Sequence, residues 1–136
     1  MTDLELIKEA ILARENSYSP YSEFMVGAAL ECKDGTIFKG CNVENAAYSP
    51  TNCAERSAIF AAVSMGHREF TRIAIVGGPK DADLLTECFP CGVCRQVMHE
   101  FVDDSSFTIL TAEVELSSKK ISPKSYRLSE LLPHAF

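Results

Sequence analysis

Residues 87–96 read ECFPCGVCRQ, which places Cys88, Cys91 and Cys94 at three-residue intervals. Cysteines at this spacing can hold zinc, form a redox pair or begin an iron–sulfur cluster. Pro90 is typical of a helix N-terminus, where free N–H groups favour thiolate over thiol. In a helix that begins there, Cys91 and Cys94 would lie on one face. This motif alone leaves zinc and redox chemistry equally open.

Two further observations narrow the choice. A bacterial ferredoxin motif needs a fourth cysteine followed by proline, but Met98 and His99 stand in that region, which disfavours an iron–sulfur cluster. Cys53, in PTNCAERS, opens another expected helix and is also primed as a thiolate. Three cysteines leave the fourth tetrahedral position of a zinc ion open, as in catalytic sites.

The three histidines do not complete this set. None of them has ligand spacing to the cysteines, and we expect all of them to be ordinary surface or core residues: His67, His99 and His134.

Glu55 allows two interpretations. Asn52 followed by Glu55 matches a capping box, in which both side chains only close the helix start. Next to an open zinc position, the same carboxylate could accept a proton from a bound water and pass it on. Three thiolates would give the zinc site a net negative charge. A guanidinium close to the thiolates would offset this charge, and Arg56, or Arg95 after Cys94, could supply it.

The elements that must position these residues follow from the hydrophobic pattern. We expect helices over residues 4–15, 53–65 and 91–101, and strands within 24–32, 36–43, 72–78, 106–116 and 122–136, the last with a short helical turn. KDG between the first two strands is a hairpin signal, and 79–90 reads as a loop. This order favours a layered α/β domain.

Composition limits the class of protein. The 136 residues suit one domain over 1–136, and 46% hydrophobic with 24% charged residues is ordinary for a globular protein. A net charge of −6 disfavours binding to nucleic acid or to anionic membranes. No apolar run is long enough for a membrane span, so we expect a cytoplasmic protein with reduced thiols.

Several motifs together carry a family resemblance: FMVGAAL, GCNVENAAYS, NCAERSA, PCGVCRQV and ELLPHAF. In order and spacing the chain resembles the short, homotetrameric, zinc-dependent cytidine deaminases. The resemblance implies a three-layer α/β/α fold with a mixed five-stranded sheet. It implies hydrolytic deamination of cytidine and 2′-deoxycytidine by a zinc-bound hydroxide in pyrimidine salvage. One Zn²⁺ per chain and a homotetramer with shared active sites are implied as well.

The resemblance also assigns roles to residues of this chain. The zinc ligands would be Cys53, Cys91 and Cys94, and the proton shuttle Glu55. Arg56 is expected as the charge-compensating residue because of the negative charge of three thiolates, not because of the resemblance. The substrate contacts would be Phe24, Asn42, Glu44, Ala54 through its N–H, Tyr48, Phe89 and Phe136. Tyr48 and Phe136 would act across a subunit boundary. Phe89 departs from the family's Ser or Thr before Pro-Cys, and Cys88 is expected to be a bystander of the zinc set.

Other interpretations stay open beside this one. A deaminase of another aminopyrimidine nucleoside-like compound could use the same fold, although Asn42 and Glu44 point to a sugar. A non-enzymatic zinc or dithiol module would not need Glu55 beside an open metal position. A nucleic-acid-editing deaminase is disfavoured because the chain is acidic and lacks a basic, aromatic path for a strand.

Overall fold

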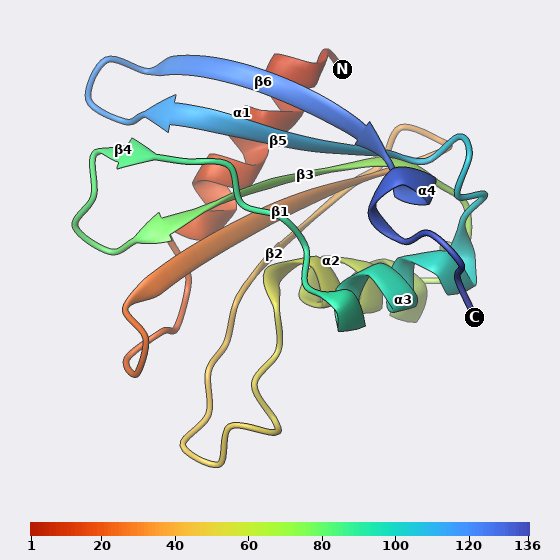
Figure 1. Cartoon of the computed structure of the whole chain (residues 1–136), viewed down its shortest axis with the longest axis horizontal. Helices are drawn as coiled ribbons and strands as arrows, with labels where there is room; N and C mark the ends of the chain where they lie inside the picture. The colour runs from red at the N-terminus through yellow and green to blue at the C-terminus, as the bar shows by residue number, and fades with distance from the viewer.

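The computed structural model describes residues 1–136 as a mixed sheet with helices on both faces (Figure 1). The helices are α1 (Asp3–Arg14), α2 (Ala54–Ser64), α3 (Gly92–Phe101) and α4 (Leu128–Leu131). The strands are β1 (Phe24–Cys32), β2 (Ile37–Cys41), β3 (Phe70–Pro79), β4 (Leu84–Leu85), β5 (Thr108–Glu115) and β6 (Lys120–Arg127). None of the helices combines the length and the apolar composition that crossing a membrane would need.

The sheet mixes antiparallel and parallel pairs. Strand β1 pairs antiparallel with β2 and β3, β3 pairs parallel with β5, and β5 pairs antiparallel with β6. The short β4 pairs with Val114 and Glu115 at the end of β5. Because β6 pairs with the same two residues, β4 and β6 lie on opposite sides of β5. The predicted layered α/β fold is confirmed, with five long strands. The sixth, β4, lies inside the stretch 79–90 that the sequence predicted as loop.

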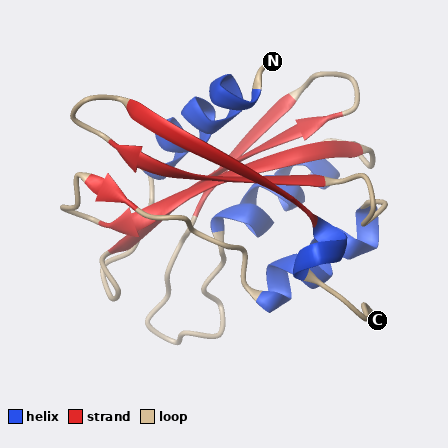
Figure 2. Cartoon of the chain, turned by 45° about the horizontal axis from the view of Figure 1, so that its top comes forward, coloured by secondary structure: helices blue, strands red, loops and turns tan.

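Helices lie on both faces of the sheet (Figure 2). Each face carries its own cluster of buried apolar side chains. Side chains alternate along a strand, so Ala28 and Leu30 of β1 face α2 and α3, whereas Ala29 faces α1. On the α1 side, Leu6 and Ile7 of the helix are fully buried against the sheet. Because α2 and α3 share one face, their N-termini can meet there.

A glycine in β2 sets how closely α2 approaches the sheet. A Cβ at Gly40 would lie 2.5 Å from the Ala54 carbonyl oxygen and 2.5 Å from the Ala58 nitrogen. Only glycine leaves room for this contact between the strand and the first turns of α2. The position of Cys53, directly before α2, therefore depends on a backbone contact with β2.

Candidate active site

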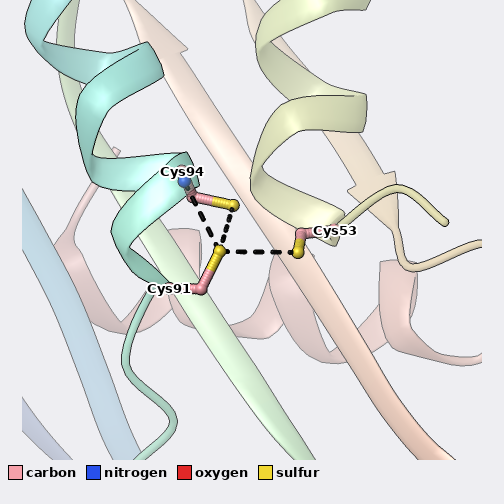
Figure 3. A group of neighbouring side chains, drawn as sticks. All are labelled: Cys53, Cys91 and Cys94. Carbon is pink, nitrogen blue, oxygen red and sulfur yellow. Dashed lines mark hydrogen bonds between the residues drawn. The ribbon is translucent and has the colours of Figure 1, made fainter. Parts of the chain in front are cut away.

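Three thiols meet where α2 and α3 begin (Figure 3). Cys53 is the N-cap of α2, Cys91 is the N-cap of α3, and Cys94 lies in the first turn of α3. The Sγ of Cys91 lies 3.8 Å from that of Cys53 and 3.4 Å from that of Cys94. A tetrahedral zinc ion with bonds of about 2.3 Å separates its sulfurs by about 3.8 Å. The three thiols therefore fit a zinc ion, and Cys88 is not among them.

A guanidinium lies against this thiol cluster. Arg56 Nη2 donates to the Cys53 Sγ at 3.3 Å, and its buried Nε has no hydrogen-bond partner. Hydrogen bonding from Cys94 lowers the pKa of Cys53, and the positive charge of Arg56 acts in the same direction. Arg95, the arginine that follows Cys94, donates instead to the carbonyl oxygens of Pro90 and Leu131, at 2.7 and 2.6 Å.

The capping interpretation of Glu55 is wrong. The N-cap of α2 is Cys53 and no side chain caps the helix, while the amide of Asn52 donates to the Ser57 hydroxyl at 3.2 Å. Glu55 is instead buried, with 4% of its surface exposed. Burial raises its pKa to about 7, and the negative charge of Cys53 acts in the same direction. A carboxyl group in this state can exchange a proton near neutral pH.

A cavity of about 250 Å³ opens beside the thiol cluster. Cys53, Cys91 and Glu55 all border it. Five of the predicted substrate contacts also line it: Phe24, Asn42, Glu44, Ala54 and Phe89. Ala54 is the first residue of α2, where a backbone N–H has no partner within the helix.

The polar residues on the cavity wall are held by the backbone around them. Asn42 accepts from the Val26 N–H at 2.9 Å and donates to the Phe24 carbonyl at 2.8 Å. Glu44 accepts from the N–H groups of residues 21–22 at 3.0 and 3.1 Å. Carboxylate oxygens have further lone pairs, so Glu44 keeps acceptor capacity at the cavity.

Cys88 has a place that sequence reasoning missed. It lies outside the thiol cluster, yet it lines the cavity. A Cβ at Gly77 of β3 would come within 2.8 Å of its Sγ, so a strand glycine makes room for this thiol. Burial raises the pKa of Cys88 to about 12, which keeps the thiol neutral. The paired glycines of β3, Gly77 and Gly78, are the sequence signal that a side chain approaches the strand closely.

Tyr48 and Phe136 do not reach the cavity of their own chain. Tyr48 is exposed, with a φ of 61°, in the loop between β2 and α2, which projects away from the sheet (Figure 1). Phe136 is fully exposed, and its carbonyl oxygen lies 3.1 Å from the His99 Nε2. Their role in a neighbouring subunit stays a prediction.

Comparison with known proteins agrees with this geometry. Residues 1–110 match the family described as the cytidine and deoxycytidylate deaminase zinc-binding region. A cytidine deaminase of Sporosarcina psychrophila is 48% identical over 97% of this chain and 89% of its own length. The crystal structure of cytidine deaminase from Burkholderia pseudomallei has a TM-score of 0.85 at 43% identity, with both chains fully covered. One from Mycobacterium tuberculosis has a TM-score of 0.78 at 35% identity, covering 100% of this chain and 98% of its own. The chain therefore belongs to the cytidine and deoxycytidylate deaminase family, which is defined by its zinc-binding region.

Proposed function

We propose that this protein is a zinc-dependent deaminase that converts cytidine and 2′-deoxycytidine to uridine and 2′-deoxyuridine. Residues 1–136 would form one catalytic domain. The observation that carries the proposal is that Glu55, a buried acidic residue, borders the same cavity as Cys53 and Cys91. The relatives named cytidine deaminases support the choice of substrate.

The residues divide the chemistry between them. Zinc held by Cys53, Cys91 and Cys94 would supply a Lewis acid that brings the ionisation of water toward neutral pH. Glu55 would accept one proton from the attacking water and deliver it to N3 of the base. It would then carry the second proton of the same oxygen to the amino group, which leaves as ammonia, and its pKa of about 7 suits both transfers. Arg56, at 3.3 Å from the Cys53 Sγ, would offset the negative charge of the thiolates.

Substrate orientation would come from the cavity wall. The amide of Asn42 and the carboxylate of Glu44 suit the hydroxyl groups of a ribose, and their bonds to the backbone hold them in place. Phe24 and Phe89 would flank the pyrimidine, and the Ala54 N–H would donate to its carbonyl oxygen.

The assembly we propose is a homotetramer in which Tyr48 and Phe136 complete a neighbour's site. Their exposure, away from their own cavity, supports this arrangement. We also place the enzyme in the cytoplasm, in pyrimidine salvage. A reducing compartment suits its six free cysteines, three of which make the proposed metal site.

The proposal is tested by incubating the protein with cytidine, 2′-deoxycytidine, cytosine and dCMP. Ammonia release and the loss of pyrimidine absorbance report turnover. We expect turnover of both nucleosides and little of the free base or the nucleotide. Turnover of cytosine or dCMP alone would contradict the proposal, and turnover of only a different aminopyrimidine nucleoside would favour the alternative substrate class.

A further inference from the structure

A second cluster of metal-ligating side chains lies at the C-terminal end of α2, the opposite end of that helix from Cys53. Cys32, Asp34 and His67 each offer one donor atom there, and these atoms lie within 4.8 Å of one another. Cys32 ends β1, Asp34 lies in the turn between β1 and β2, and His67 lies in the segment that follows α2. None of them lines the proposed catalytic cavity.

The backbone holds two of these residues through a tight turn. Cys32 ends β1, and its N–H donates to the Thr36 carbonyl at 2.9 Å. The Gly35 N–H donates back to the Cys32 carbonyl at 2.9 Å, with a φ of 92° that favours glycine. The Cys32 and Asp34 side chains are therefore presented by an ordered hairpin.

His67 is held by the end of α2. The N–H groups of Gly66 and His67 donate to the carbonyl oxygens of Val63 and Ala62, both at 3.0 Å, which is a Schellman motif. The imidazole packs edge-on against Phe38, with the ring centres 5.1 Å apart. Its Nδ1 faces the Asp34 carboxylate.

The distances suit a shared ion better than a direct hydrogen bond. The His67 Nδ1 and the Asp34 Oδ2 are 3.7 Å apart, which is too long for a hydrogen bond. Two N or O ligands on a tetrahedral zinc are about 3.3 Å apart. The other oxygen of Asp34 accepts from the Thr36 N–H at 2.9 Å, and this bond orients the carboxylate.

Charge and space also fit a cation. A hollow of about 230 Å³ is bordered by all three donors, so a water ligand has room beside them. A thiolate and a carboxylate balance the charge of a divalent ion. Lys33, Arg68 and Glu69 also border the hollow. Lys33 pairs with Glu69 at 3.6 Å, and Arg68 donates to the Val63 and His67 carbonyl oxygens at 2.8 and 2.9 Å, so neither cation is bonded to the three donor side chains.

We propose that Cys32, Asp34 and His67 form a second site for a divalent ion of the zinc type, with water as its fourth ligand. Imidazole, thiolate and carboxylate are a ligand set that zinc accepts. The ion links the β1–β2 turn to the end of α2. This role does not depend on deamination, and it differs from the surface or core role that the sequence predicted for His67.

The test is a count of zinc per chain after equilibrium dialysis of the whole protein against excess Zn²⁺. We expect about two zinc ions in the wild-type chain and about one in Cys32→Ser and His67→Gln. Cys41→Ser and His134→Gln are matched controls that should keep about two, because neither residue belongs to either cluster. One zinc in the wild type, or two in both cluster variants, would overturn the proposal.

A thermal readout separates lost binding from lost folding. Cys32 is buried and its substitution can disturb the core, whereas the side chain of His67 is 26% exposed. Added Zn²⁺ should raise the Tm of the wild type and of Cys41→Ser but not that of His67→Gln. His67→Gln should keep its cytidine turnover, so a failure of this site and a failure of the proposed deamination give different results. An equal rise of Tm in His67→Gln would contradict the second site.

Discussion

The contribution of each cysteine in the thiol cluster to zinc binding can be tested by substitution. Cys53→Ala, Cys91→Ala and Cys94→Ala should each lose one equivalent of zinc and nearly all turnover, because two thiolates hold the ion too weakly. Metal analysis after dialysis and a cytidine assay measure both effects. Cys88→Ser is the matched control, since Cys88 lines the cavity outside the cluster. It should keep its zinc, and a loss of zinc there would show that the ligand set is wrong.

Glu55 can be tested with a substitution that changes its proton chemistry but hardly its shape. Glu55→Gln should keep zinc and fold but lower kcat by roughly 10²–10⁴-fold, because an amide cannot accept and release the proton. Metal analysis, circular dichroism and steady-state kinetics check this outcome. Near-normal turnover in the variant would remove Glu55 from the mechanism.

At the scale of elements, β5 and β6 hold the loop that carries Phe89. Glu87 accepts from the hydroxyls of Thr111 and Tyr126, at 3.0 and 2.8 Å, and pairs with Lys124 at 2.8 Å. The Phe89 ring packs edge-on against Tyr126, with centres 5.3 Å apart. Through these contacts the sheet positions one wall of the cavity.

Removing the Glu87 carboxylate should therefore loosen that wall without touching the metal ligands. We expect Glu87→Ala to raise KM for cytidine about tenfold with zinc content unchanged. Kinetics and metal analysis measure these two quantities. The control is Glu113→Ala, which removes an exposed carboxylate from β5, the strand that also carries Thr111. Equal KM values for the two variants would argue against a positioning role.

The start of α1 is tied to the sheet by ion pairs that respond to acid. Arg72 donates to both carboxylate oxygens of Glu31 at 2.8 Å and also pairs with Asp3. The hydrogen bonds from Arg72 lower the pKa of Glu31 below its ordinary value of 4.5. A lowered folded-state pKa gives stability that is present above pH 4.5 and is lost as the pH falls through the folded-state value.

Glu31→Gln should consequently lower the free energy of unfolding at pH 7 by about 1 kcal/mol, and the difference should disappear in acid. Urea unfolding between neutral and acidic pH measures it. Glu69→Gln is the control, because its pair with Lys33 is exposed and should change stability by less than about 0.5 kcal/mol. A difference from wild type that persists unchanged in acid would contradict this account.

At the scale of the whole molecule, Phe136 tests whether subunits share their sites. Deletion of Phe136 and Phe136→Ala should both lower kcat/KM roughly tenfold, because each would remove the ring that the proposed tetramer places in a neighbour's cavity. Phe136→Ala removes the ring but keeps the carbonyl oxygen that contacts His99, so its effect reports on the ring alone. Sizing should show a particle near four times 15.0 kDa. A fully active monomer in which Phe136 is dispensable would exclude the shared site.

Much of this architecture could be predicted from local pattern. The long helices and strands lie within a few residues of their expected bounds, because each buries a periodic apolar face. Strand β4 has two residues, too few for any period, and exists only through pairing with β5. The backbone bonds of Asn42 reach across the β1–β2 hairpin, and the cavity that Cys88 lines combines residues from 22–26, 42–55 and 88–91. The sequence indicates the hairpin and the close approach at Gly77, but which side chains meet in the cavity depends on how these segments pack.

The glycine at position 40 carries a consequence for how this enzyme can vary. The first turns of α2 rest on β2 where Gly40 has no side chain, and a methyl group there would lie 2.5 Å from backbone atoms of α2. In a saturation-mutagenesis library selected for growth with cytidine as the only pyrimidine source, position 40 should tolerate as little substitution as Cys53, although it has no reactive atom. In related sequences we therefore expect amino-acid replacement at position 40 to be as rare as replacement of the proposed zinc ligands.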